Sequence, residues 1–117
     1  MSAESDLYTL LSGNAGVAAL VSTRIYPDLV PEGKTLPYIG YERVSTEPVN
    51  ALSGAQLGAL VGLTVACWAG TRVAAEALAD AVVAALAPSS FAYLARGVEM
   101  DEATGRLAAT VDCRILV

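Results

Sequence analysis

The stretch LVGLTVACWAGTRVAAEALADAVVAALAP, residues 60–88, decides the fold, because a strand pattern passes directly into a helix pattern within it. In residues 60–69, alternate side chains point to opposite faces of a strand. One face carries Leu63, Val65 and Cys67, and the other carries Thr64, Ala66 and Trp68. Neither face is clearly polar, so the pattern predicts a strand that must be covered on both sides.

The second half of this stretch predicts a long helix. Thr71 is a suitable N-cap, Arg72 to Ala87 are mostly helix-forming alanine and leucine, and Pro88 ends the helix. Arg72, Glu76 and Asp80 follow the helical period and form a narrow polar stripe. The opposite, apolar stripe is formed by Leu78, Val82 and Leu86.

Towards the N-terminus, residues 5–11 and 15–21 have the pattern of two short helices. Prolines and a glycine in residues 24–34 predict a loop, and aromatic and β-branched residues in 38–45 predict a strand. Residues 47–58 contain one proline and two glycines. We interpret this segment as a long connection between neighbouring strands.

Towards the C-terminus, residues 91–101 and 106–117 predict two further strands joined by a tight turn at 102–105. The last strand alternates clearly, with Cys113 on the apolar side and Asp112 and Arg114 on the polar side. The expected fold is therefore α+β. We predict a single domain over residues 1–117, with an antiparallel sheet of about four strands and with one long helix and short N-terminal helices packed on one face.

The composition is too apolar for a small core alone. Hydrophobic residues make up 55% of the chain and charged residues 16%, with a mean hydropathy of +0.53. No charge occurs from Pro48 to Thr71, but glycines and polar residues divide this stretch, so we expect no membrane span. The acidic N-terminus does not resemble a signal peptide, which predicts a cytoplasmic site of synthesis. The surplus apolar surface is therefore expected at subunit contacts.

The sequence offers little for catalysis or for a cofactor. It contains no histidine, which excludes His-dependent triads and the commonest metal sites. Cys67 and Cys113 lie among aliphatic residues and are predicted to be buried free thiols. The acidic pair Asp101 and Glu102 is predicted to be a solvated turn, and the glycines around Gln56 lack the lysine of a phosphate loop. We expect no catalytic, cofactor-binding or metal-binding residues.

The charge of the chain also argues against general binding of nucleic acid. The net charge is −5, and Lys34 is the only lysine. Such a chain lacks the clustered cations that neutralise phosphates, so general DNA binding is not expected. An acidic surface is still compatible with a passage through which DNA slides without specific binding.

Several short motifs, taken in order, resemble one family. They are Arg24-Ile25-Tyr26-Pro27, Leu36-Pro37-Tyr38-Ile39-Gly40-Tyr41, the uncharged approach to Val65-Ala66-Cys67-Trp68-Ala69, the alanine-rich helix and the closing hairpin. Together they resemble the tail-completion, or tail-terminator, family of long-tailed phages, prophages and gene transfer agents. The similarity covers nearly the whole chain and depends on the order and spacing of the motifs.

This resemblance implies a structural virion protein of the tail or neck. Such a subunit forms a hexameric ring on the last ring of tail-tube protein, stops growth of the tube and meets the head-tail connector protein. The resemblance implies no catalytic residues in this chain, because the family has none to transfer. We expect the ring contacts to come from the connection at 49–60 and from the outer face of the second strand, at Val49, Leu52, Leu57, Leu60 and Trp68.

Two other interpretations remain open at this point. Another neck component, such as a head-completion or adaptor protein, would have the same acidic and oligomeric character. A small dimeric enzyme or ligand-binding domain would instead enclose a pocket lined by Tyr38, Tyr41 and Trp68.

Overall fold

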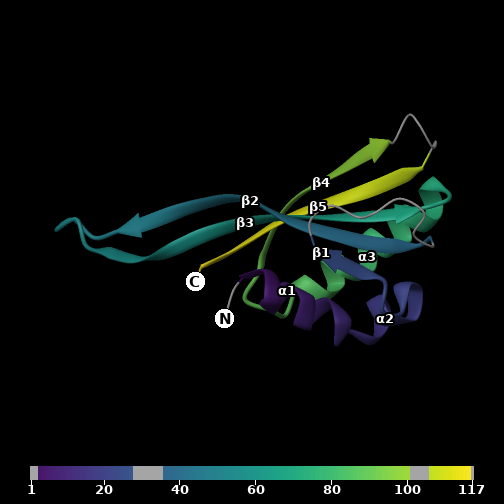
Figure 1. The fold of residues 1–117 in the computed structure, drawn as a ribbon, viewed down its shortest axis with the longest axis horizontal. Helices are drawn as coiled ribbons and strands as arrows, with labels where there is room; N and C mark the ends of the chain where they lie inside the picture. Colours follow the sequence, from purple (N-terminus) through teal and green to yellow (C-terminus); the bar gives the residue numbers. More distant parts are fainter. Residues whose placement is uncertain (1–2, 28–35, 101–105, 117) are drawn as a thin grey trace.

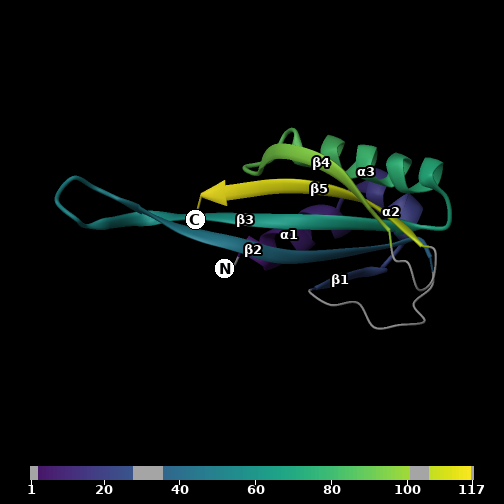
Figure 2. The ribbon, with the colours of Figure 1, turned by 90° about the horizontal axis from the view of Figure 1, so that it is seen from above.

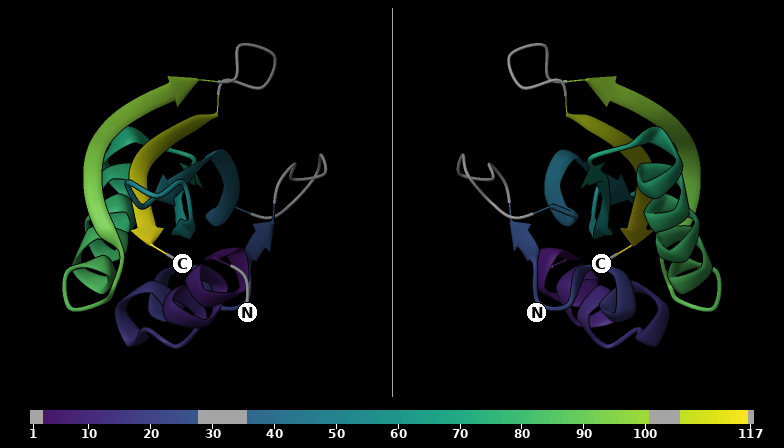
Figure 3. Two further views of the ribbon diagram at one scale, coloured as in Figure 1. Left: turned by 90° about the vertical axis from the view of Figure 1, so that its left-hand side faces the viewer. Right: turned by 90° about the vertical axis from the view of Figure 1, so that its right-hand side faces the viewer.

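A twisted sheet and three helices make up the computed structural model, which describes residues 3–27, 36–100 and 106–116 (Figure 1). In chain order the described elements are α1 (Ala3–Ser12), α2 (Ala15–Val21), β1 (Ile25–Pro27), β2 (Tyr38–Asn50), β3 (Gln56–Ala69), α3 (Arg72–Leu86), β4 (Ala92–Met100) and β5 (Leu107–Leu116). The helices lie on one face of the sheet, which curves around them when seen along the long axis (Figures 2 and 3). The predicted α+β class and the placement of the helices are confirmed.

The sheet has the order β1-β2-β3-β5-β4, with β3 at its centre. Strand β3 pairs antiparallel with both β2 and β5, and β4 pairs antiparallel with β5. The helices packed on the sheet cover the face of β3 that carries Leu63, Val65 and Cys67, and these three residues are completely buried. The residues between them on β3 remain half-buried on the other face.

The predicted antiparallel sheet of about four strands is not fully matched, because the described sheet has five strands and one of them is parallel to its neighbour. Residues Ile25–Pro27, predicted to be part of a loop, form β1 and pair in parallel with β2 at the edge of the sheet. Two contacts fix this strand: Ile39 N–H donates to the Arg24 carbonyl at 3.0 Å, and Arg24 Nε donates to the Pro37 carbonyl at 2.8 Å. A strand of three residues that ends in proline is too short to show a period in the sequence, and its pairing is set by contacts with residues distant in the chain. The rest of the predicted loop, residues 28–34, lies outside the described residues.

The interpretation of residues 47–58 as a long connection is wrong. Strands β2 and β3 continue through this segment as a ladder from Glu47–Leu60 to Asn50–Gln56, so that only the turn between them is irregular. The ladder has one register shift between Arg43 and Ser45, where Val44 is the extra residue, and another at Asn50. Pro48 is accommodated because this part of β2 lies at the edge of a two-stranded ribbon.

A dry core lies between the sheet and the helices. Its largest fully buried side chains come from every layer: Leu7, Leu11, Ile39, Leu63, Leu78, Leu86, Val17, Val21, Val61, Val65, Val82 and Val111. Among the described residues, no polar or charged side chain is buried in it. The apolar stripe predicted for the long helix is confirmed, because Leu78, Val82 and Leu86 all face this core. The helix α1 begins at Ala3, two residues before the predicted start.

The N-cap of α3 gives a first test of the fold. Thr71 Oγ1 accepts a hydrogen bond from Ala74 N–H at 3.2 Å, as predicted for a cap. Thr71→Ala should lower the free energy of unfolding by about 1 kcal/mol, because one backbone N–H loses its partner. Thr71→Ser, which keeps the hydroxyl, should retain most of the stability. Urea unfolding of both variants measures the difference, and equal stability of all three proteins would contradict a role for the cap.

Candidate assembly surface

The most prominent surface feature is a two-stranded arm made by the ends of β2 and β3. Strand β5 ends opposite Leu60, so beyond this point β2 and β3 pair only with each other. We call residues 48–59 the hairpin arm. It projects from the body along the longest molecular axis, and the described molecule measures 51 × 30 × 22 Å (Figure 1). The radius of gyration, 14.9 Å, exceeds the roughly 13 Å expected for a compact chain of this length.

The tip of the hairpin arm is an ordered turn. Ala51 N–H donates to the Ala55 carbonyl at 2.7 Å, and Gly54 N–H donates to the Ala51 carbonyl at 2.9 Å. Gly54 has a φ of 89°, a conformation that side chains disfavour. This turn presents Leu52 with a relative exposure of 110%, and Leu57 follows with 71%. Two leucines are thus held in water by a defined backbone, on an arm without any charge.

The five predicted interface residues do not form a single cluster. Val49, Leu52 and Leu57 lie in the hairpin arm, and Leu60 lies at its base. Trp68 lies at the opposite end of β3, where its ring is 6.4 Å from that of Tyr38. Leu52 and Leu57 are exposed, whereas the other three are half-buried. The structure therefore distributes four of these residues along the arm, from its tip to its base, and leaves Trp68 apart.

An ion pair holds the strand that leads into the hairpin arm against the first helix. Arg43 donates to Glu4 Oε1 from Nε at 3.1 Å and from Nη2 at 2.5 Å, and its Nη1 donates to Thr46 Oγ1 at 3.2 Å. Both charged side chains remain more than one-third exposed. The hydrogen bond from Arg43 lowers the pKa of the Glu4 carboxyl. Sequence reasoning missed this pair, because the two residues are 39 positions apart in the chain.

A second exposed apolar surface lies on the edge strand β4. All nine residues of this strand are exposed, including Tyr93, Leu94, Val98 and Met100. Within the described part of the chain, β4 has a partner strand on one side only. Its Arg96 reaches back to α3 and contacts Asp80 at 2.5 Å and Glu76 at 2.6 Å. These charges and a register shift at Leu94 are typical devices that keep an edge strand from unspecific pairing.

The aromatic pocket of the ligand-binding interpretation is not formed. Tyr38 pairs with Trp68 and faces away from the helices, whereas Tyr41 pairs with the core residue Val65 and is 94% buried on the helix side of the sheet. Because residues 38 and 41 are separated by an odd number of positions, they point to opposite faces. Tyr38 instead packs against Tyr26 and Trp68, with ring centroids 6.1 and 6.4 Å away.

The two thiols are free and buried, as predicted. Burial raises the pKa of Cys67 from 9.0 to about 12 and that of Cys113 to about 11, which leaves both as poor nucleophiles at neutral pH. Of the other candidates, Asp101 and Glu102 lie outside the described residues. No three potential metal ligands cluster within residues 3–27, 36–100 and 106–116. None of the helices described has the length and hydropathy of a bilayer span.

The raised thiol pKa values predict a loss of stability at high pH. Thiols of the unfolded chain ionise above about pH 9, whereas those of the folded chain stay protonated until pH 11–12, so stability is full below pH 9 and falls above it. Each buried thiol contributes a slope of up to about 1.4 kcal/mol per pH unit in this window. Urea unfolding at pH 8, 9 and 10 should show a flatter dependence for Cys67→Ala than for the unmodified chain. Parallel curves would mean that Cys67 ionises equally in both states.

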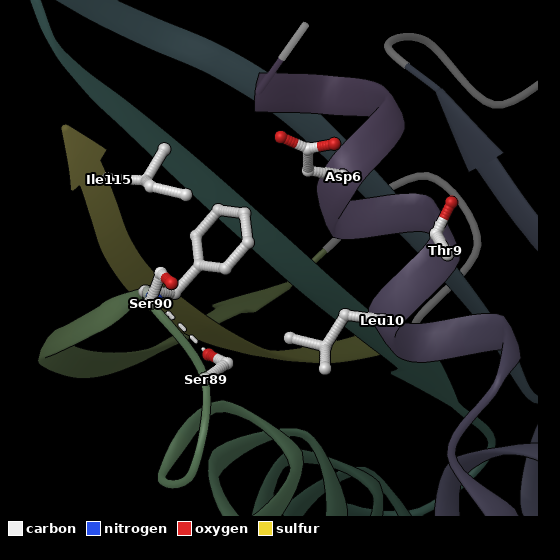
Figure 4. Close-up of a pocket in the computed structure, with 7 residues that line it drawn as sticks. Asp6, Thr9, Leu10, Ser89, Ser90 and Ile115 are labelled. Carbon is white, nitrogen blue, oxygen red and sulfur yellow. Dashed lines mark hydrogen bonds between the residues drawn. The ribbon is translucent and has the colours of Figure 1, made fainter. Parts of the chain in front are cut away.

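A shallow cavity of about 370 Å³ lies on the body, between α1 and the start of β4 (Figure 4). Its floor is apolar and its rim carries hydroxyls and one carboxylate; the lining residues are Leu10, Phe91, Ile115, Asp6, Thr9, Ser89 and Ser90. The Ser89 hydroxyl donates to the Leu86 carbonyl at 2.7 Å and accepts from Phe91 N–H at 3.1 Å. These two bonds fix the turn between α3 and β4, and with it one wall of the cavity. We call this site the body cavity.

The fold and its exposed surfaces indicate a protein that assembles with other subunits. The exposed apolar groups lie on a projecting arm and an edge strand, and the described residues provide no activated nucleophile. Such features are typical of a subunit that assembles with other proteins. A chain from the virion of a native gene transfer agent particle has a similar fold, with a TM-score of 0.78 and 23% identity over 95% of this chain and 90% of that chain.

Sequence comparison gives the family. The family described as tail completion protein gp17 matches residues 5–117, nearly the full length, and the chain belongs to this family. Comparison with curated protein sequences finds no match. The protein is therefore a structural component of a phage-type tail and not an enzyme, as the resemblance of its motifs implied.

Proposed function

We propose that this protein forms a closed ring of identical subunits that ends the tail tube and joins it to the head-side connector. The observation that carries the proposal is the uncharged hairpin arm with Leu52 and Leu57 in water. The described part of the subunit leaves both leucines uncovered, and membership of a tail completion family supplies a setting in which subunits meet. Six copies are what the resemblance to tail terminators implies.

The shape of the subunit supports a ring more than a symmetric dimer. A dimer with twofold symmetry uses the same patch on both copies, whereas an arm that reaches a different patch on its neighbour makes a head-to-tail contact. Repeated head-to-tail contacts close into a ring when the rotation between copies is suitable. The arm and the edge strand β4 are two separate exposed surfaces on one subunit.

The charge of the subunit supports a passage for DNA through the ring. A net charge of −5 per copy would be multiplied around the ring, and phosphates would find few cations to bind. The partners in this proposal are the tail-tube protein on one side and the connector on the other, in the neck of the virion. Assembly would take place in the cytoplasm of the host.

Native mass spectrometry of the purified protein, alone and mixed with its tail-tube protein, tests the ring. A closed oligomer of one size, with six copies as the expected number, supports it. A strictly monomeric species in both conditions contradicts it.

Electron microscopy of particles assembled without this gene tests the position. Tails of uncontrolled length are expected if the protein ends the tube. Finished tails detached from full heads would instead assign it to the head side of the neck.

A further inference from the structure

We propose that the tip of the hairpin arm of one subunit docks into the body cavity of the next subunit, with Leu52 as the inserted side chain. This inference rests on the proposed ring and names the contact that builds it. The occupant of the cavity is thus a second copy of this chain.

The tip of the arm and the body cavity are chemically complementary. The tip offers the fully exposed Leu52, and the cavity offers a floor of Leu10, Phe91 and Ile115. A volume of about 370 Å³ is larger than one leucine side chain, so the flanking residues of the turn can enter as well. Burial of an exposed leucine in such a site is favourable because apolar surface leaves water.

The charges of two neighbouring copies favour a contact through the uncharged arm. Two copies that each carry a net charge of −5 repel one another, and Asp6 on the rim gives the cavity the same sign. The hairpin arm is the outer part of an uncharged stretch that runs from Pro48 to Thr71. It can therefore approach an acidic copy without a repulsive pair at the contact. The Asp6 carboxylate and the rim hydroxyls can accept hydrogen bonds from amide N–H groups of the turn.

The arm cannot dock into the body cavity of its own chain. The turn lies at the far end of the longest axis, and the two views of the ribbon agree that α1 and the start of β4 lie on the body (Figures 1 and 2). The arm is held straight by a continuous ladder from Glu47–Leu60 to Asn50–Gln56. Because the tip cannot fold back onto the cavity of its own chain, any body cavity that it enters belongs to another copy.

Engineered cysteines test the contact directly. A chain with Leu52→Cys and Ser90→Cys is oxidised under conditions in which the unmodified chain is a ring, alone or with its tail-tube protein. Ser90 lines the cavity and is exposed, and the native thiols are buried and do not interfere. Non-reducing electrophoresis should show a ladder of covalent oligomers up to the full ring. An equal mixture of the two single variants should give dimers only, because each chain then holds one new cysteine.

Two further double-cysteine variants test whether the body cavity is the docking site. Leu52→Cys combined with Tyr8→Cys, an exposed position on α1 outside the cavity, should give no ladder. Leu52→Cys combined with Leu94→Cys tests the edge strand β4 of the neighbour as the alternative acceptor. A ladder with either of these pairs that equals or exceeds the ladder with Ser90→Cys would overturn the proposal.

A charge at the tip tests the energetics. Leu52→Asp should raise the dissociation constant of the ring at least about tenfold, because a buried apolar contact is exchanged for a carboxylate beside Asp6. Leu20→Asp, the same change at an exposed leucine of α2 that lies outside the arm, the body cavity and β4, should leave it unchanged. A ring of normal stability in Leu52→Asp overturns the docking alone. An unmodified chain that stays monomeric in all conditions removes the ring itself and the docking with it.

Discussion

A chain whose hairpin arm has been removed should remain a folded monomer but should no longer form rings or complete tails. The variant replaces residues 48–59 with Asn-Gly, which joins the register partners Glu47 and Leu60 through a two-residue turn. The core should survive, because every fully buried large side chain lies outside the deleted segment. Circular dichroism and thermal unfolding check the fold, and native mass spectrometry checks the oligomeric state.

The expected effect on assembly is large. Transfer of each of the Leu52 and Leu57 side chains from water into an apolar site contributes about 1.5–3 kcal/mol to the free energy of association. Loss of both contacts should weaken each subunit contact at least about a hundredfold. Leu52→Ser with Leu57→Ser keeps the arm at full length and serves as the matched control: it should reproduce most of the loss if apolar contact is the cause. Normal rings in the shortened chain would show that the arm is dispensable.

Val65→Asp should prevent folding, whereas Ala66→Asp, one residue further along β3, should not. Val65 is completely buried on the helix side of the sheet, and the described core holds no polar side chain that could pair with a carboxylate. Burial of an unpaired charge costs more than about 4 kcal/mol, which is comparable to the whole stability of a small domain. Ala66 faces away from the helices and is only half-buried, so its carboxylate can stay hydrated.

Soluble yield and urea unfolding measure both variants. The unmodified chain and Ala66→Asp should unfold cooperatively at similar urea concentrations, and Val65→Asp should be insoluble or unfolded. Equal stability of the two variants would contradict the assignment of faces on β3. Because the two positions are adjacent and receive the same side chain, the comparison isolates the direction in which each residue points.

The parts of the fold that the sequence predicts well are those with a local cause. Thr71 and Pro88 mark the ends of α3, and the alternation in residues 107–116 marks β5, because caps and periods depend on neighbours along the chain. Strand β1 could not be predicted in this way. It consists of three residues, and its pairing with β2 is set by contacts more than ten positions away.

The hairpin arm shows a different limit of sequence reasoning. Glycine and proline in residues 47–58 are typical of loops, but a ribbon of two strands accepts both, because only one side of each strand needs a partner. The absence of charge in the same segment led to the prediction of subunit contacts at Val49, Leu52 and Leu57, which stays a prediction. The structure shows that Leu52 and Leu57 are exposed, on an element that the sequence reasoning assigned wrongly.

The body cavity carries no signal in the sequence. Its lining comes from α1, from the turn after α3 and from the end of β5, which are separated by most of the chain. Leu10, Phe91 and Ile115 are ordinary apolar residues in their local patterns. Only the packing of α1 beside the end of the sheet brings them to one site.

The extra residue at position 44 has a consequence for the evolution of such particles. Val44 is exposed and has no partner in the ladder, and on either side of it Arg43 pairs with Leu63 and Ser45 pairs with Gly62. Deletion of this one codon would leave every cross-strand pair intact but would remove the additional twist that a bulge gives to a strand. The direction of the arm would then change while its chemistry stayed the same. In the proposed ring, a single in-frame deletion would thus change the angle at which neighbouring subunits meet.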